Sequence, residues 1–257
     1  MAVVLLIGIV GLTSCHSKEA ASSDAKPADT NLVSTPAAPA TSAPAPSTPA
    51  QDTTPAAPAM SSDDMQLIRD AYTLDTQGKY DDALAKVNTV VKSNPKSIPA
   101  YILRGDIYSR KKQFDMSQKD YDSVLQLDPK NGTAKFNAAE LKFMQKDYDG
   151  ARPGFVELEA NSDLGDLATY KVFLCDLFGG HTDVAQKEYD DFNKVGGNAS
   201  YYFANVAWDV YHKNTEDART WLGSAQRIYP PQKFALYASS LHDLGYLPLP
   251  PLPAPAN

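Results

Sequence analysis

The chain has 257 residues, and its 24 lysines and arginines are outnumbered by 31 aspartates and glutamates, which gives a formal net charge of −7. This acidic balance excludes the basic surface that a nucleic-acid-binding protein needs, so we expect no nucleic acid partner. The chain has two cysteines. If the first is modified, as argued below, Cys175 has no partner, and we expect a buried, inert thiol and no structural disulfide.

The N-terminal segment is an apolar run, residues 2–12, which is followed by a cysteine at position 15. It is too short to span a bilayer but has the length of a signal-peptide core. Residues 12–15, Leu-Thr-Ser-Cys, resemble the bacterial lipobox. By this resemblance residues 1–14 are a lipoprotein signal peptide, and lipidated Cys15 anchors the chain in a bacterial cell envelope. In some bacteria an aspartate directly after the cysteine keeps a lipoprotein in the inner membrane. This chain has His16 there, which indicates the outer membrane, facing the periplasm. A chance cysteine is the alternative, because no lysine or arginine opens the run.

Residues 15–61 consist mostly of alanine, proline, serine and threonine. This composition cannot form a packed core and favours extended polyproline geometry. At ~3.1 Å per residue, about 45 such residues reach up to roughly 140 Å. We therefore expect a disordered tether between the anchor and a folded domain at residues 62–246.

A pattern with a period of thirty-four residues follows the tether. Residues 78–83, 112–117 and 146–151 have similar sequences. In each, an aromatic residue is followed three positions later by a small residue. A fourth unit is less regular, and a fifth fits after a shift of one residue. A strict period of this length indicates a stack of similar units. The apolar spacing predicts two amphipathic helices of about fourteen residues in each unit.

The pattern resembles the tetratricopeptide repeat, a helix–turn–helix unit of thirty-four residues. The second unit matches best, at Tyr101, Gly105, Tyr108, Phe114, Ser117, Tyr121, Val124 and Pro129. The resemblance implies an all-α, right-handed superhelical solenoid of about five units. Residues 232–246 are expected to form a capping helix, and the proline-rich residues 247–257 a disordered tail.

In this family the first helix of each unit lines a concave groove, so the resemblance also implies where a partner binds. The expected groove residues are Tyr72, Phe136, Phe143, Tyr170, Leu174, Tyr201, Trp208 and Tyr211. Large amphipathic aromatic side chains are typical of binding hot spots. The alternative is that the capping helix folds back over this end and makes the aromatic residues part of the core. The sequence leaves both interpretations open.

No motif in the sequence indicates catalysis. The histidines at 181, 212 and 242 fall in different parts of their units, which argues against a metal site, and no nucleophile elbow or phosphate-binding loop is found. We expect no enzyme, no metal and no cofactor.

The favoured function is a membrane-anchored adaptor that binds a peptide or helical segment of a partner protein in its groove. The layout of anchor plus repeats resembles that of outer-membrane assembly lipoproteins and pilus pilotins. Two alternatives remain: a self-associating structural or spacer lipoprotein, and a scaffold that carries an unrecognised enzymatic site.

Overall fold

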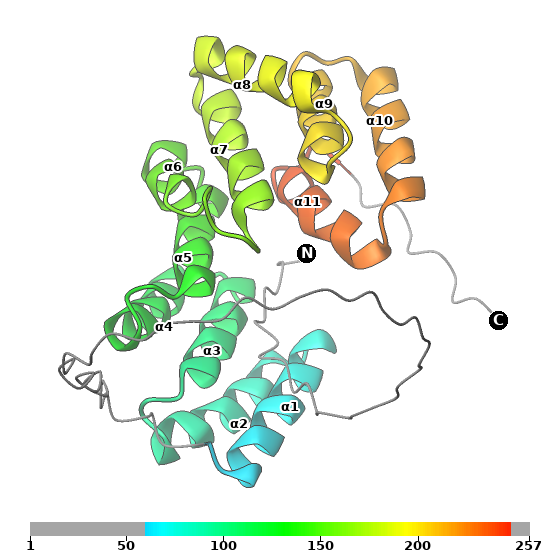
Figure 1. Ribbon diagram of the computed structural model, residues 1–257. Coiled ribbons are helices and arrows are strands. Elements are labelled where there is room, and N and C mark those ends of the chain that lie inside the picture. Colours follow the sequence, from blue (N-terminus) through cyan, green and yellow to red (C-terminus); the bar gives the residue numbers. More distant parts are fainter. Residues whose placement is uncertain (1–59, 248–257) are drawn as a thin grey trace, which may run out of the picture. The chain divides into compact units, whose positions relative to one another are not determined.

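The computed structural model describes residues 60–247, which fall within one compact unit and contain eleven helices and no strand (Figure 1). The helices are α1 (Ser62–Thr76), α2 (Tyr80–Ser93), α3 (Ile98–Arg110), α4 (Phe114–Leu127), α5 (Gly132–Met144), α6 (Tyr148–Val156), α7 (Gly165–Gly179), α8 (Thr182–Val195), α9 (Ala199–Tyr211), α10 (Thr215–Ile228) and α11 (Pro231–Asp243). Within this range no helix has the length and apolar character needed to cross a membrane. The signal peptide, Cys15, all but the end of the tether, and the tail from residue 248 lie outside the described residues and stay predictions.

The helices pack as consecutive pairs, from α1 with α2 to α9 with α10, and the second helix of each pair packs against the first helix of the next. A small residue recurs every thirty-four positions on the second helix of four pairs, at Ala83, Ser117, Ala151 and Ala185, and all four are 0% exposed. Small side chains let two helices approach closely, and Ser117 Oγ donates a hydrogen bond to the carbonyl of Gly105 at 2.7 Å. The predicted all-α solenoid of repeated helix pairs is confirmed.

The turn inside each pair places one residue in the left-handed region of backbone space. These residues are Gly78, Lys112, Lys146, Gly180 and Lys213, with φ of 74°, 58°, 63°, 88° and 65°. The first four are thirty-four positions apart, and the fifth follows after thirty-three, which locates the one-residue shift of the fifth unit. Glycine adopts such a φ at no steric cost, whereas lysine does so at a cost. The packing of the two helices therefore holds the turn in this conformation even where the residue is a lysine, for which it is unfavourable.

The second helix of the third pair, α6, is shorter than expected. It has nine residues, Tyr148–Val156, where the sequence pattern predicts about fourteen. Pro153 lies inside it and lacks a backbone N–H, which weakens the helix. The chain then turns, and Asn161 Oδ1 accepts hydrogen bonds from the N–H groups of Asp163 and Leu164, both at 2.9 Å. These bonds satisfy two backbone N–H groups in the turn just before α7 begins.

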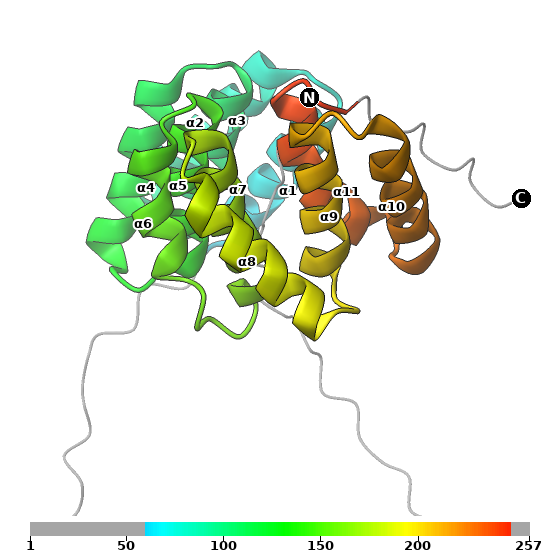
Figure 2. The same ribbon diagram turned by 90° about the horizontal axis from the view of Figure 1, so that it is seen from above.

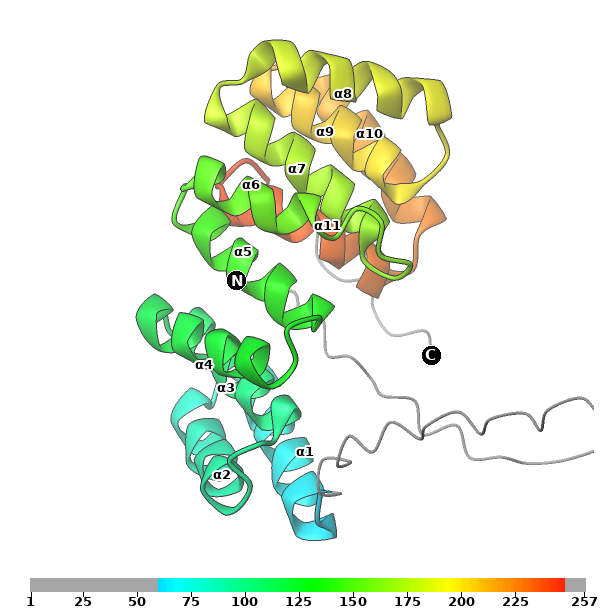
Figure 3. The ribbon, with the colours of Figure 1, turned by 60° about the vertical axis from the view of Figure 1, so that its left-hand side comes forward.

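The last helix, α11, does not continue the alternating stack. It packs chiefly against α9 and reaches α7 through side chains, whereas its packing against α10, the helix before it, is slight. Figures 2 and 3 show α11 beside α7 and α9. The predicted C-terminal helix is present, and it covers one side of the first helices of the fourth and fifth pairs.

The close contact between α3 and α4 gives a test of the packing. A Cβ at Gly105 would lie 2.7 Å from a ring carbon of Tyr121, which is fully buried and cannot move aside. Although alanine favours a helix by up to about 1 kcal/mol, we expect Gly105→Ala to lower the free energy of unfolding by about 1–3 kcal/mol through overpacking. Urea unfolding followed by circular dichroism measures the change.

The matched control is Gly223→Ala on α10, where the added Cβ would meet no atom of another helix within 4 Å. Here only the helix preference acts, and we expect stability to rise by about 0.5–1 kcal/mol. Equal effects of the two substitutions would show that the α3–α4 contact does not require glycine.

Candidate functional site

The first helices of the first two pairs expose an apolar stripe. Met65, Ile68 and Tyr72 are spaced i, i+3 and i+7 on α1 and so share one face. Met65 is 38% exposed and Tyr72 is 39% exposed. Pro99 and Ile102 occupy the equivalent positions on α3, thirty-four residues later, and reach solvent as well. We call the side of α1, α3, α5, α7 and α9 that carries these positions the inner surface.

Four of the expected groove residues do not lie open on the inner surface. Phe136 and Phe143 are 1% exposed, and Tyr170 and Leu174 are 0% exposed. The rings of Phe136 and Phe143 pack against Phe155 of α6, with centroids 5.2 and 6.5 Å away. Neighbours within the chain cover these four side chains in this structure, and their contact with a partner stays a prediction.

Three of the remaining expected groove residues are half-buried on α9. Trp208 stacks on Tyr189 of α8, with ring centroids 4.5 Å apart. Tyr201 meets Trp221 of α10 edge-on at 5.6 Å, and Tyr211 meets a ring of α7 in the same way. Their rings are thus engaged by neighbouring helices, and each offers only part of its surface. Among the eight expected residues, exposed Tyr72 alone stands in an apolar stripe that nothing in the described chain covers.

The inner surface of α7 and α9 is occupied by α11. The ring of Tyr237 lies 5.5 Å from the rings of Tyr170 and Phe203, and Phe234 lies 5.4 Å from Phe203. The Tyr237 hydroxyl donates a hydrogen bond to Asp166 at 2.5 Å. The core-packing alternative for the aromatic residues is thus the one that describes Tyr170, and the open part of the inner surface is limited to α1, α3 and the adjoining end of α5.

A buried lysine joins three helices at the border between the open and the occupied parts. The side chain of Lys171, on α7, is 2% exposed. Its Nζ donates to Glu140 Oε1 of α5 at 2.6 Å and to Ser240 Oγ of α11 at 2.5 Å. The same ammonium lies 4.8 Å from the ring centroid of Phe143. Because a buried charge is costly unless it is paired, this geometry fixes α11 relative to α5 and α7.

One repeat earlier, the position of Glu140 is taken by Asp106, which is also buried. The Tyr121 hydroxyl donates to Asp106 Oδ1 at 2.6 Å, and Asn137 Nδ2 donates to the same oxygen at 2.9 Å. Burial raises the pKa of the Asp106 carboxyl to about 7, although both hydrogen bonds act in the opposite direction. Asn137 and Lys171 are equivalent residues of consecutive units, so the first helices carry a ladder of buried polar contacts.

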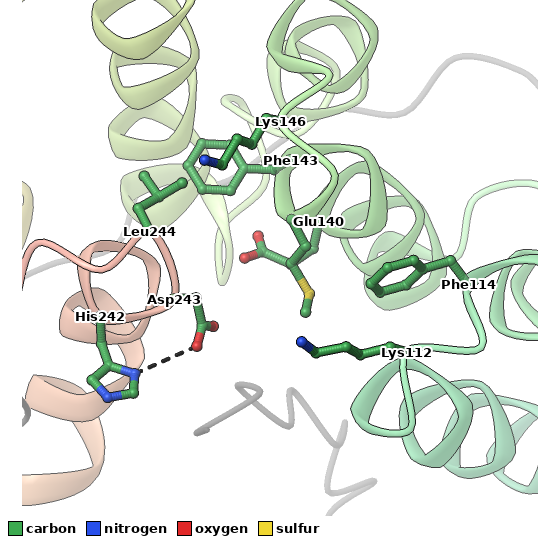
Figure 4. Close-up of a pocket in the computed structure, with 9 residues that line it drawn as sticks. Lys112, Phe114, Glu140, Phe143, Lys146, His242, Asp243 and Leu244 are labelled. Atoms are coloured by element: carbon green, nitrogen blue, oxygen red, sulfur yellow. Dashed lines mark hydrogen bonds and ion pairs between the residues drawn. The ribbon is translucent and has the colours of Figure 1, made fainter.

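A cavity of about 350 Å³ lies where α11 ends (Figure 4). Its lining residues are Lys112, Phe114, Glu140, Phe143, Met144, Lys146, His242, Asp243 and Leu244. The walls come from the turn after α3 and the first residue of α4, from α5 and the turn after it, and from the C-terminal end of α11. The volume is at the lower end of small-molecule pockets. Two lysines and two carboxylates face it, so the cavity suits one polar side chain of a docked segment.

A second polar cluster joins α6, α7 and α8. Arg152 Nε donates to both carboxylate oxygens of Asp176, at 2.9 and 2.8 Å, and His181 Nδ1 lies 3.1 Å from Asp176 Oδ1. Burial, with the neighbouring Asp176 charge, raises the pKa of Glu188 to about 8. Among residues 60–247 no three metal-ligating side chains converge. Nearby Cys175 is buried, and burial raises the pKa of its thiol well above the ordinary value.

Comparison with known proteins agrees with this geometry. Residues 98–131, the α3–α4 pair, match the tetratricopeptide repeat family. A crystal structure of PilW, described as a widely conserved type IV pilus biogenesis factor, is 15% identical, with a TM-score of 0.54 over 72% of this chain and 89% of that chain. A MamA RS-1 double mutant is 14% identical, with a TM-score of 0.51 over 66% of this chain and 96% of that chain. One pair of helices therefore matches a tetratricopeptide repeat, and the fold of the described chain is similar to that of these two solved structures.

Two further comparisons carry no argument about the family of the whole chain. A tetratricopeptide repeat protein from Parabacteroides merdae is 17% identical, with a TM-score of 0.49 over 72% of this chain and 75% of that chain. No curated protein matches the sequence. At such identities the solved structures show a likeness of fold, and the binding properties of this repeat protein must be argued from its own residues.

Three residues that organise the inner surface were missed by the repeat pattern. Lys171 stands where the two preceding units have Leu103 and Asn137, and a charge at that position was the available signal. Tyr237 and Ser240 contact residues 71 and 69 positions away. They belong to no repeat position, so no periodic signal could connect them with the inner surface.

Removal of the buried ammonium tests its role. Lys171→Met keeps much of the side-chain volume but leaves Glu140 without its partner, and we expect the free energy of unfolding to fall by about 3 kcal/mol. Adding Glu140→Gln removes the unpaired charge and is expected to restore more than half of the loss, as measured by urea unfolding. Lys194→Met breaks a pair whose partners are more than 70% exposed and should change stability by less than about 1 kcal/mol. A similar effect in both single variants would contradict the proposed role.

The carboxyl of Asp106 predicts a pH dependence of stability. Its pKa rises from 3.8 to about 7 on folding, so the folded state resists an ionisation that the unfolded chain undergoes freely. No penalty acts below pH 4. Between pH 4 and 7 the protein should lose stability relative to Asp106→Asn by up to about 1.4 kcal/mol per pH unit, and the difference should be constant above pH 7.

Parallel urea titrations of the two proteins at pH 4 to 8 measure this difference. Asp122→Asn, which removes an exposed carboxyl of α4, is the control. A stability difference between the parent and Asp106→Asn that stays constant from pH 4 to 7 would show that the Asp106 carboxyl ionises as readily in the folded protein as in the unfolded chain.

Proposed function

We propose that the protein is an adaptor that binds a segment of a partner protein on the open part of its inner surface. The observation that carries this proposal is the apolar stripe of Met65, Ile68 and Tyr72, which is continued by Ile102 on α3 and which no described part of the chain covers. Tetratricopeptide repeat proteins are generally scaffolds without catalytic activity, and stacked helical repeats commonly use their concave side for binding.

The charges near the stripe indicate what kind of segment it takes. Arg110 of α3 pairs with Asp75 of α1, and this largely buried pair adds no net charge beside the stripe. Apolar side chains of the partner would then supply most of the binding energy, with Tyr72 as an aromatic anchor. A short helix or an extended segment with apolar residues at regular spacing fits such a surface. The cavity beside Glu140 could receive one polar side chain of the same segment.

The location of this adaptor follows from the N-terminal prediction. Lipidation of Cys15 would hold the protein at a bacterial envelope membrane, with residues 16–61 as a tether that lets the repeats reach partners away from the bilayer. The outer membrane, facing the periplasm, is the location that we propose. The PilW structure with a similar fold belongs to a pilus biogenesis factor, which supports an envelope assembly complex as the type of partner.

Photocrosslinking in the native cell tests the adaptor role. A photoreactive amino acid at Tyr72 and, separately, at Ile102 should capture a discrete partner that mass spectrometry identifies. Thr89 of α2 and Gln126 of α4, which are exposed on second helices, are the controls. Equal capture at all four positions, or capture at the control positions alone, would contradict binding at the inner surface.

A change of affinity provides an independent measurement. Truncation of an aromatic anchor typically costs 2 kcal/mol or more, so Tyr72→Ala should weaken binding of the captured partner by about thirtyfold. Thr89→Ala should leave it unchanged.

A further inference from the structure

The last helix of the chain occupies the inner surface as a bound helix would. Phe234, Tyr237 and Leu241 are spaced i, i+3 and i+7 on α11, and they are 6%, 3% and 0% exposed. The first two insert between rings of α7 and α9, at Tyr170 and Phe203. An amphipathic helix that lays anchors with this spacing into an apolar groove is a recurrent mode of recognition between separate chains.

Polar contacts fix the position of α11 in this groove. The Tyr237 hydroxyl donates to Asp166 at the start of α7, and Lys171 Nζ donates to Ser240, one helical turn further along α11. A helix shifted by a turn would lose both bonds and leave the buried ammonium with one partner fewer. The groove is therefore specific for the sequence of α11, which any copy of this chain carries.

The connection before α11 is short and stiff. Helix α10 ends at Ile228, and only Tyr229 and Pro230 precede Pro231, the first residue of α11. Pro230 has φ −62° and ψ 151°, the extended polyproline geometry. Because α11 packs only slightly against α10, its departure from the groove would uncover one side of α9 but leave the contact between α9 and α10 in place. We call Tyr229, Pro230 and Pro231 the hinge.

We propose that α11 exchanges between two copies of the protein, so that α11 of one copy occupies the inner surface of α7 and α9 in the other. The exchanged dimer keeps the contacts that α11 makes in the groove, because Tyr237 then meets the partner's Asp166 and Ser240 the partner's Lys171. Its free energy differs from that of two monomers by the cost of association and by any strain released at the hinge. Short hinges are the ones that favour such exchange.

The exchange does not depend on the adaptor role, since it uses α7, α9 and α11 and leaves the stripe on α1 and α3 free. It would also be a mechanism by which the protein self-associates, which is the alternative function that the sequence left open.

Mixed-isotope crosslinking tests the exchange in the full chain. Leu244 lines the cavity together with Met144 of α5, so Leu244→p-benzoylphenylalanine should crosslink to the peptide that contains Met144. Equal amounts of ¹⁵N-labelled and unlabelled chains are mixed unfolded, refolded together at about 1 mM, the effective concentration that short linkers give, and irradiated. Exchange predicts that up to half of the crosslinks within dimers join a light chain to a heavy one. The same analogue at exposed Gln226 of α10 should give none to this peptide.

The unmodified chain is examined by sedimentation in parallel, and we expect a dimer at about 1 mM that dissociates on hundredfold dilution. Insertion of Gly-Ser-Gly-Ser before Pro230 relaxes the hinge and should reduce the dimer fraction several-fold, whereas the same insertion between Gly196 and Gly197, in the turn before α9, should not. A chain that stays monomeric, or a dimer whose crosslinks all lie within one chain, would overturn the proposal. In the second case a different surface mediates self-association.

Discussion

A single ammonium group on α7, with 2% of its side chain exposed, holds α11 against α5 and α7. Lys171 Nζ is desolvated, and this cost is offset by the Glu140 carboxylate, the Ser240 hydroxyl and the face of Phe143. These three groups come from α5 and α11. The contacts that stabilise the charge therefore also hold α11 in place. The inner surface is covered on α7 and α9, where α11 packs, and open on α1 and α3.

Much of the fold could be predicted because each helix of the repeats packs mainly against helices that are near it in the sequence. The thirty-four-residue period fixes which helices pair, and it recurs in Ala83, Ser117 and the left-handed turn residues. The length of α6 could not be read from the same pattern. The apolar spacing around Pro153 still has a helical period, but Pro153 lacks a backbone N–H, and tighter bonds from Leu158 to Phe155 and from Glu159 to Val156 follow the helix and end it early.

The candidate site was harder to predict, since repeat position defines only the direction of a side chain and says nothing of what covers it. Tyr72 and Tyr170 occupy inner-surface positions of their own units, yet the first is 39% exposed and the second 0%. The difference arises from α11, which is not a repeat unit and whose contacts come from far along the sequence. A residue-by-residue transfer of a family's groove fails at such a place, because burial depends on a partner helix that the period does not encode.

Contacts of α11 join residues that lie much farther apart in the sequence than those joined by contacts within the stack. Within the stack, bonds such as Ser117 to Gly105 and Asn137 to Asp106 close loops of 12 and 31 residues, whereas Lys171 to Ser240 and Tyr237 to Asp166 close loops of 69 and 71. Local contacts form quickly, and distant ones must first overcome a larger loss of chain entropy. Helix pairs can therefore assemble unit by unit, and among the described helices the seating of α11 requires the longest loops to close. A chain emerging from the ribosome would complete α7 and α9 well before the helix that covers them exists, and their aromatic faces would meet solvent or other proteins in that interval.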